Sequence, residues 1–108
     1  MSDIIYRYSG YLSIDSGRAS ALKELRLQPS FDVGLDYIEI IYTGRDANRF
    51  MVTELKKIAT MIESATGEVT CAYQNESEDP KFEFYTIENG KLYLQRGTIL
   101  RERSKSEC

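Results

Sequence analysis

Hydrophobic and polar residues alternate along several stretches of the chain, and a period of two is typical of β-strands. In the first stretch, Ile4, Tyr6, Tyr8, Leu12 and Ile14 share one face. Strands are therefore expected over residues 4–14, 35–43, 68–74, 81–87 and 91–100. The stretch 35–43 is apolar on both faces, which favours a central strand.

A different period appears between residues 47 and 65. Apolar residues recur there at steps of three and four, a pattern that predicts an amphipathic helix; they are Met51, Leu55, Ile58, Ile62 and Ala65. Asp46 or Asn48 is a suitable N-cap, and Gly67 is expected to close the helix in a left-handed conformation. A shorter helix is expected over residues 18–27.

The order of these elements, β-α-β-α-β-β-β, predicts an α+β domain with a mostly antiparallel five-stranded sheet and two helices on one face, a ferredoxin-like variant. A parallel crossover from the second strand to the third is the alternative. The Asn89-Gly90 pair predicts a type I′ turn between the last two strands. Residues 1–101 are expected to form one domain, with residues 102–108 as a frayed tail.

Composition narrows the possible chemistry. The 108-residue chain has no histidine, a net charge of −3 and two cysteines. Histidine-activated nucleophiles and histidine metal ligands are therefore excluded, and no catalysis, metal or cofactor is expected. Cys71 alternates with Val69 and Tyr73, so we expect a buried thiol that does not pair with Cys108. An acidic chain without a long apolar run or a signal segment predicts a cytoplasmic protein that binds neither nucleic acid nor a membrane.

Carboxylates are concentrated in one part of the chain. Between residues 63 and 88 there are seven of them against one cation, Lys81. We expect a surface for a basic partner here, with tyrosines adding contact area. Its predicted residues are Glu76, Glu78, Asp79, Glu83, Tyr85 and Tyr93, which Asp36 and Glu39 would extend. An acidic loop that only keeps the hairpin soluble is an equal alternative. Weaker patterns are a catalytic carboxylate pair, a metal site at 76–79 and a phosphate site at 44–46.

Several runs in the second half carry a resemblance to a known family. They are Gly67-Glu68-Val69 after the long helix, the segment Asp79-Pro80-Lys81-Phe82-Glu83-Phe84-Tyr85, and the segment from Glu88-Asn89-Gly90 through Ile99-Leu100-Arg101. Over residues 47–101 the chain resembles small bacterial immunity proteins of polymorphic toxin systems, including contact-dependent growth inhibition.

The resemblance implies a short cytosolic protein that binds one cognate toxin domain in a 1:1 complex and occludes its active cleft. Many such toxins are nucleases with basic clefts, which an acidic protein would approach through electrostatic steering. The alternative is a ferredoxin-like regulatory or small-ligand-binding domain that acts as a homodimer. A small lyase or isomerase that uses Glu and Tyr is a third possibility.

Overall fold

The structure is a computed structural model that describes residues 4–23, 30–75, 79–97 and 106–108. Its elements, in chain order, are β1 (Tyr6–Ser13), α1 (Ser16–Lys23), β2 (Phe31–Val33), β3 (Tyr37–Gly44), α2 (Phe50–Ile62), β4 (Val69–Tyr73), β5 (Lys81–Glu88), β6 (Lys91–Gly97) and β7 (Ser106–Glu107).

The described strands form one seven-stranded sheet in the order β2-β3-β1-β4-β5-β6-β7. Every neighbouring pair is antiparallel. The α+β class and the antiparallel sheet are therefore confirmed, whereas the count of five strands is wrong and the ferredoxin-like arrangement is not shown. β3 and β4 run in the same direction on either side of β1, so α2 connects them without making them direct neighbours.

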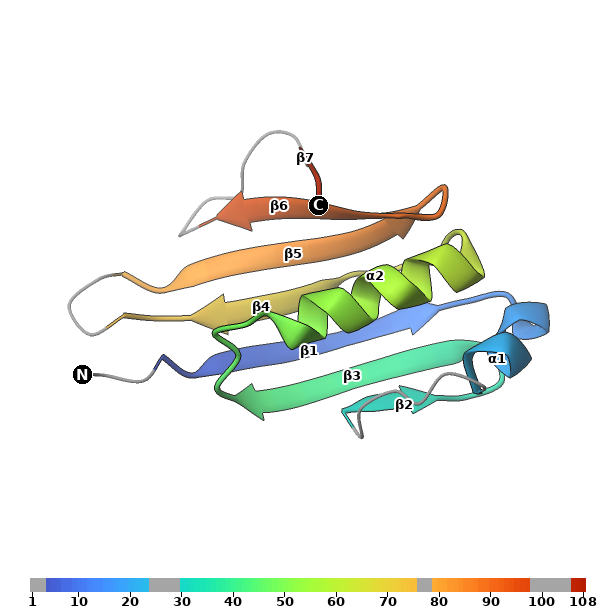
Figure 1. Ribbon diagram of the computed structural model, residues 1–108, viewed down its shortest axis with the longest axis horizontal. Coiled ribbons are helices and arrows are strands. Elements are labelled where there is room, and N and C mark those ends of the chain that lie inside the picture. Colours follow the sequence, from blue (N-terminus) through green and yellow to red (C-terminus); the bar gives the residue numbers. More distant parts are fainter. Residues whose placement is uncertain (1–3, 24–29, 76–78, 98–105) are drawn as a thin grey trace.

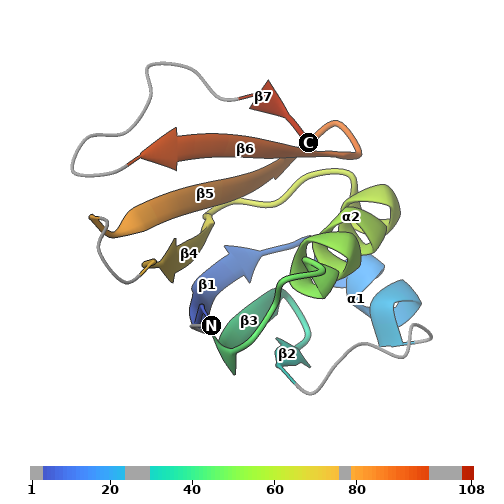
Figure 2. The ribbon, with the colours of Figure 1, turned by 60° about the vertical axis from the view of Figure 1, so that its left-hand side comes forward.

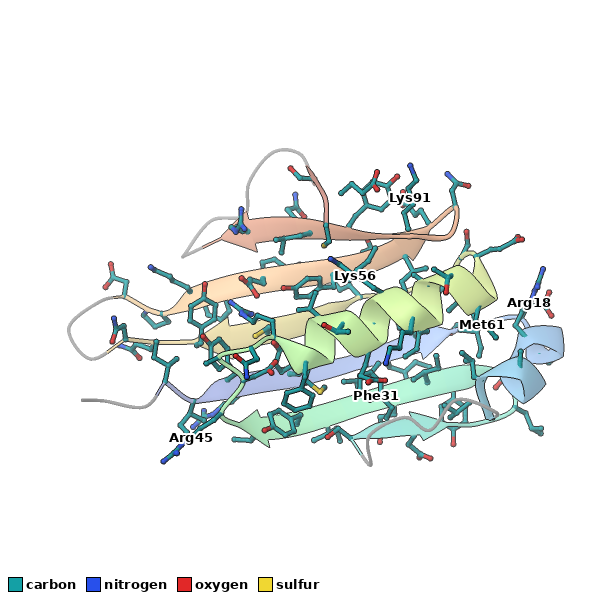
Figure 3. All side chains as sticks on the ribbon, viewed as in Figure 1. Arg18, Phe31, Arg45, Lys56, Met61 and Lys91 are labelled. Carbon is teal, nitrogen blue, oxygen red and sulfur yellow. The ribbon has the colours of Figure 1, made fainter. Side chains whose placement is uncertain are left out.

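The two helices lie on one face of the sheet (Figures 1 and 2). α2 is the one long helix of the described residues and crosses the middle of the sheet, while the eight-residue α1 lies beside it. Lys56 is exposed and lies midway along α2, and Met61 lies near the C-terminal end of this helix, toward α1 (Figure 3). None of the described helices covers the opposite face of the sheet.

The core lies between α2 and the covered face. The predicted apolar stripe of α2 is confirmed for Met51, Leu55, Ile58 and Ile62, which are all buried, whereas Ala65 lies beyond the end of the helix and is partly buried. They pack with buried strand residues, the largest fully buried of which are Tyr8, Leu12, Ile38, Ile40, Val69, Cys71 and Ile87. Burying one such aliphatic side chain contributes about 1.5–3 kcal/mol.

The ends of α2 differ from the prediction. Arg49 is the N-cap residue, with φ of 55° and ψ of 43°. Asp46 nevertheless serves the helix, because its Oδ1 accepts the Phe50 N–H at 2.8 Å. The helix ends at Ile62, where Glu63 takes φ of 63°, so Gly67 is not its cap.

Gly67 instead allows the chain to pass close to β1. Its φ is 109°, and a Cβ there would collide with the Tyr11 carbonyl oxygen. Next to it, Thr66 forms a bridge with Ser13, and each N–H donates to the other's carbonyl oxygen at 2.8 and 2.9 Å. The absence of a side chain at Gly67 therefore lets the segment that follows α2 lie directly against β1.

The C-terminal hairpin follows the prediction more closely. Asn89 and Gly90 have φ of 52° and 75°, as a type I′ turn requires. The end of the chain is not wholly a frayed tail, because β7 pairs with β6. The Cys108 N–H also donates to the Leu92 carbonyl oxygen at 2.9 Å.

The strand expected to be central, β3, is an interior strand of the sheet, but only one of its faces is buried. β3 is second from one edge, between β2 and β1. One of its faces packs on the core through Ile38 and Ile40, while Ile41 on the other face is exposed.

Candidate functional site

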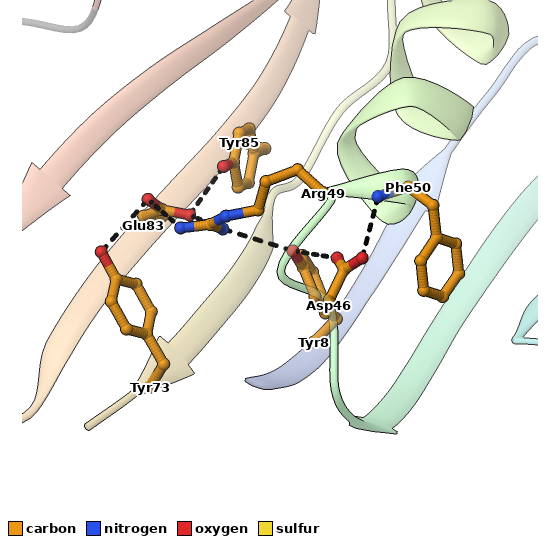
Figure 4. A network of polar contacts seen from close by, with 7 residues as sticks. All are labelled: Tyr8, Asp46, Arg49, Phe50, Tyr73, Glu83 and Tyr85. Carbon is orange, nitrogen blue, oxygen red and sulfur yellow. Dashed lines mark hydrogen bonds and ion pairs between the residues drawn. The ribbon is translucent and has the colours of Figure 1, made fainter. Parts of the chain in front are cut away.

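A cluster of charged and aromatic side chains lies at the N-terminal end of α2 (Figure 4). Its centre is the ion pair between Arg49 and Glu83, residues 34 positions apart in the sequence. The Arg49 guanidinium donates from Nη1 to Glu83 Oε1 at 2.6 Å and from Nη2 to Oε2 at 3.0 Å. This forked geometry is the strongest that arginine forms with a carboxylate.

Aromatic rings surround the guanidinium. Its central carbon lies 4.6 Å from the centre of the Tyr6 ring and 5.1 Å from that of Tyr73. Rings at these distances attract a cation. Arg49 therefore contacts β1, β4 and β5 from the N-cap position of α2.

The buried carboxylate of Glu83 has further donors. The Tyr85 hydroxyl donates to Oε1 at 2.7 Å, and the Tyr73 hydroxyl donates to Oε2 at 3.5 Å. With the two guanidinium bonds, both oxygens of this carboxylate are occupied. A buried charge is tolerated when it is paired and hydrogen-bonded in this way.

A second carboxylate, Asp46, connects the helix to the first strand. Its Oδ2 accepts the Tyr8 hydroxyl at 2.7 Å, while Oδ1 caps the helix through the Phe50 N–H. Arg49 Nη1 also donates to the Tyr8 oxygen at 3.4 Å. The two carboxylates are thus linked through Tyr8 and Arg49 into one network.

Burial keeps the phenol hydroxyls of Tyr8 and Tyr85 and the thiol of Cys71 protonated. Desolvation, aided by hydrogen bonds to Asp46 and Glu83 respectively, raises the pKa values of Tyr8 and Tyr85 above the usual tyrosine range. Desolvation also raises the pKa of Cys71 to about 11. A buried thiol with such a pKa is a poor nucleophile at neutral pH. The predicted burial of Cys71 and its lack of a disulfide are confirmed.

The network stabilises the position of α2 on the sheet. It connects the start of the helix to β1, β4 and β5. Most of the donors and acceptors of these side chains are bonded to one another. Sequence reasoning missed it, because Arg49, Asp46 and Tyr8 carry no local signal for a long-range cluster. The sequence contained one clue. Glu83 is on the same strand face as Tyr85 and Ile87, so if that face is buried, the Glu83 carboxylate is buried too and needs a cation as its partner.

Four of the residues predicted to bind a partner are described by the structure, and these four do not share one exposed surface. Glu83 and Tyr85 are buried beneath α2, so the structure contradicts their placement at an exposed interface. Tyr93 is half-buried and pairs with Thr86 on the opposite face of the hairpin from Tyr85. Asp79 is exposed, and Glu76 and Glu78 lie outside the described residues. No group of three carboxylate or cysteine side chains in the described ranges is placed to hold a metal ion.

The uncovered face of the sheet carries a different group of exposed residues. Ile5, Tyr11 and Ile41 are 44, 53 and 63% exposed there, and Leu35, in the turn between β2 and β3, is 76% exposed. Tyr11 stacks on Tyr37 with ring centres 5.4 Å apart and the planes inclined by 11°. The polar residues of this region include Glu39, which is paired directly with both Tyr11 and Asp32.

A hollow of about 460 Å³ adjoins this face near the start of β1. Its lining includes Ile5, Arg7, Ala72 and Phe82. Phe82 also stacks on Phe84, with ring centres 6.3 Å apart. The uncovered face therefore offers both flat aromatic area and a recess of side-chain size.

The described part of the chain contains no helix long and apolar enough to cross a membrane. Comparison with family models, with curated proteins and with solved structures finds no match for this chain.

Proposed function

We propose that this protein is an immunity protein, which binds a cognate bacterial toxin domain and occludes its active cleft. The observation that carries the proposal is the uncovered sheet face with its exposed apolar side chains. The stacked rings of Tyr11 and Tyr37 make an aromatic area on this face, and exposed apolar patches on a small domain are typical of protein–protein interaction sites. Aromatic side chains supply much of the binding energy at such sites.

Occlusion requires a rigid surface rather than a reactive group. The Arg49–Glu83 network holds α2 against the sheet and so keeps the strands of the opposite face in a fixed arrangement. A preorganised surface loses less conformational entropy when it binds. The network is thus a scaffold for binding in this proposal, with no catalytic step assigned to it.

The alternative of a ferredoxin-like regulatory domain uses the same face for a homodimer. The hollow beside Arg7 would then hold a small ligand. The acidic residues of β2 and β3 disfavour this arrangement, since two copies meeting through these strands would bring like charges together.

Coexpression tests the proposal directly. The partner to use is the C-terminal domain encoded by the reading frame adjacent to this one. We expect the chain to restore growth of cells that express this domain, and the purified proteins to form a 1:1 complex in calorimetry. Growth inhibition that persists in the presence of well-folded protein would rule out an immunity function against this domain.

A further inference from the structure

Large exposed hydrophobic side chains are unevenly distributed over the molecule. Among the described residues there are four, Ile5, Tyr11, Leu35 and Ile41, and each lies on or directly beside β1 or β3. Tyr11 and Ile41 are at alternating positions whose neighbours Leu12 and Ile40 are buried. They therefore point away from α2, to the uncovered face.

The aromatic part of this area is already ordered. Tyr11 and Tyr37 come from neighbouring strands and stack almost in parallel. Stacking restricts both rings before any partner binds. The pair thus provides contact area with little further loss of side-chain entropy.

The charges around these residues are mainly negative. Asp32 and Glu39 are directly paired across β2 and β3, and both are exposed, as is Asp36 in the turn between the strands. Like charges directly opposite each other destabilise a sheet. Arg7 is the one cation within the described spans of β1, β2 and β3.

We propose that Tyr11, Asp32, Leu35, Tyr37, Glu39 and Ile41, here called the β3 patch, form the docking surface for a protein partner that presents lysines or arginines around a flat apolar area. This inference rests on the proposed function only for the partner's identity as a toxin. The charge of the patch favours a basic partner over a second copy of this chain, because two acidic patches repel each other.

The β3 patch differs from the acidic surface expected around residues 76–85. In that segment the buried Glu83 is already neutralised by Arg49, whereas Glu39 lies opposite another carboxylate. A basic partner would relieve the repulsion between Asp32 and Glu39. Partner binding and sheet stability are therefore coupled at this pair.

Photo-crosslinking in the native cell locates the partner surface. The photoreactive residue p-benzoylphenylalanine replaces Ile41 in one variant and the exposed Thr60 of α2 in the control. We expect a crosslink to a different, basic protein from position 41 and none from position 60. A crosslink only to a second copy of the chain, or none at all from position 41, would overturn the inference.

The captured partner is then purified and its association rate measured at low and high salt. We expect Glu39→Lys to slow association about tenfold at low salt and to weaken the salt dependence. The matched control is Asp79→Lys, the same charge change at an exposed site of the β4–β5 connection, which should leave the rate unchanged. Equal rates for wild type and Glu39→Lys would refute the β3 patch.

Thermal melting separates an interface effect from unfolding. Glu39→Lys replaces a like-charge pair with an opposite-charge pair, so its melting temperature should equal or exceed that of the wild type.

A basic partner that is not a toxin would support the β3 patch and reject the immunity function. A toxin domain that is neutralised normally by Glu39→Lys would support the function and reject the β3 patch.

Discussion

Glu83 shows how a single position reverses the expected orientation of a strand. β5 alternates, so either the face of Phe82 and Phe84 or the face of Glu83, Tyr85 and Ile87 had to be buried. Sequence alone favours placing the carboxylate outside, because an isolated buried charge is costly. The structure buries it because Arg49 supplies a forked ion pair from α2. That partner is distant in sequence, so a local pattern does not reveal it.

Removal of Arg49 should reveal how much the network stabilises the fold. Arg49→Ala leaves the Glu83 carboxylate buried with two weaker tyrosine donors. We expect a loss of roughly 3 kcal/mol in the free energy of unfolding, since breaking a buried ion pair leaves an uncompensated charge. Alanine keeps a Cβ in the left-handed conformation at this position, so the backbone strain is the same in both proteins. Urea unfolding measures the change.

Two further variants show whether the loss in Arg49→Ala comes from the ion pair with Glu83. Lys56→Ala removes an exposed cation from the same helix and should change the stability by less than about 0.5 kcal/mol. The double variant Arg49→Ala with Glu83→Gln should recover part of the loss, because it no longer buries an unpaired charge. Independent, additive effects of the two substitutions would contradict a coupled pair.

Cys71 makes the free energy of unfolding depend on pH in the alkaline range. Burial raises its pKa to about 11 in the folded protein, above the value of an exposed thiol, about 8.5–9. The unfolded chain therefore loses this proton first, and the folded state is progressively destabilised as the pH rises from about 9 to 11. The contribution of Cys71 is present in full below about pH 8 and amounts to about 3 kcal/mol.

Urea unfolding between pH 8 and 11 tests this dependence. We expect Cys71→Ala to be less stable than the wild type at pH 8 because of the lost packing, but to lose less stability on going to pH 11. Tyr8 and Tyr85, whose pKa values are also raised, contribute the remaining decline in both proteins. Parallel pH profiles for the two proteins would exclude Cys71 as the source.

At the scale of elements, long periodic segments were predictable and short ones were not. α2 has a continuous apolar stripe, and the turn at Asn89-Gly90 has residues that tolerate positive φ, so both were identified. β2 and β7 span three and two residues and exist through pairing with β3 and β6. Their sequences carry too few positions for a periodic pattern, and only the neighbouring strand makes them strands.

Gly10 tests the close packing of two elements. Gly10 pairs in register with both Ile40 and Val69, in the middle of β1. A Cβ at this position would lie 2.7 Å from the Val69 Cα and 2.8 Å from the Glu68 carbonyl oxygen. Gly10→Ala must therefore separate β1 from β4, and we expect it to cost about 1–3 kcal/mol in urea unfolding.

The same substitution in α1 provides the control. A Cβ at Gly17 would meet only Asp15 Oδ1, at the ordinary contact distance of 3.5 Å. Alanine also has the higher helix propensity, so Gly17→Ala should be neutral or slightly stabilising. If both variants were equally stable, the spacing between β1 and β4 would not depend on the missing side chain.

At the scale of the whole molecule, the sheet has one face covered by α1 and α2 and one face that none of the described helices covers. β3 is apolar on both sides, and the sequence therefore favoured a central strand with both faces buried. In the structure one side packs on α2 and the other exposes Ile41. Positions where apolar strand residues are exposed instead of buried often belong to functional surfaces. The mismatch at β3 is thus consistent with a face that a partner covers.

This interpretation makes a final prediction about stability and binding together. Leu35 and Ile41 are mostly exposed, so Leu35→Ser with Ile41→Thr should change the free energy of unfolding by no more than about 1 kcal/mol. Threonine retains the β-branch that a strand favours. The matched control, Ile38→Thr, makes the same replacement at a fully buried position of β3 and should cost at least about 2 kcal/mol. If the β3 patch docks a partner, the double variant should bind it far more weakly in calorimetry while keeping its fold. A double variant that binds like the wild type would place the interface elsewhere, and one that unfolds would show that these side chains belong to the core.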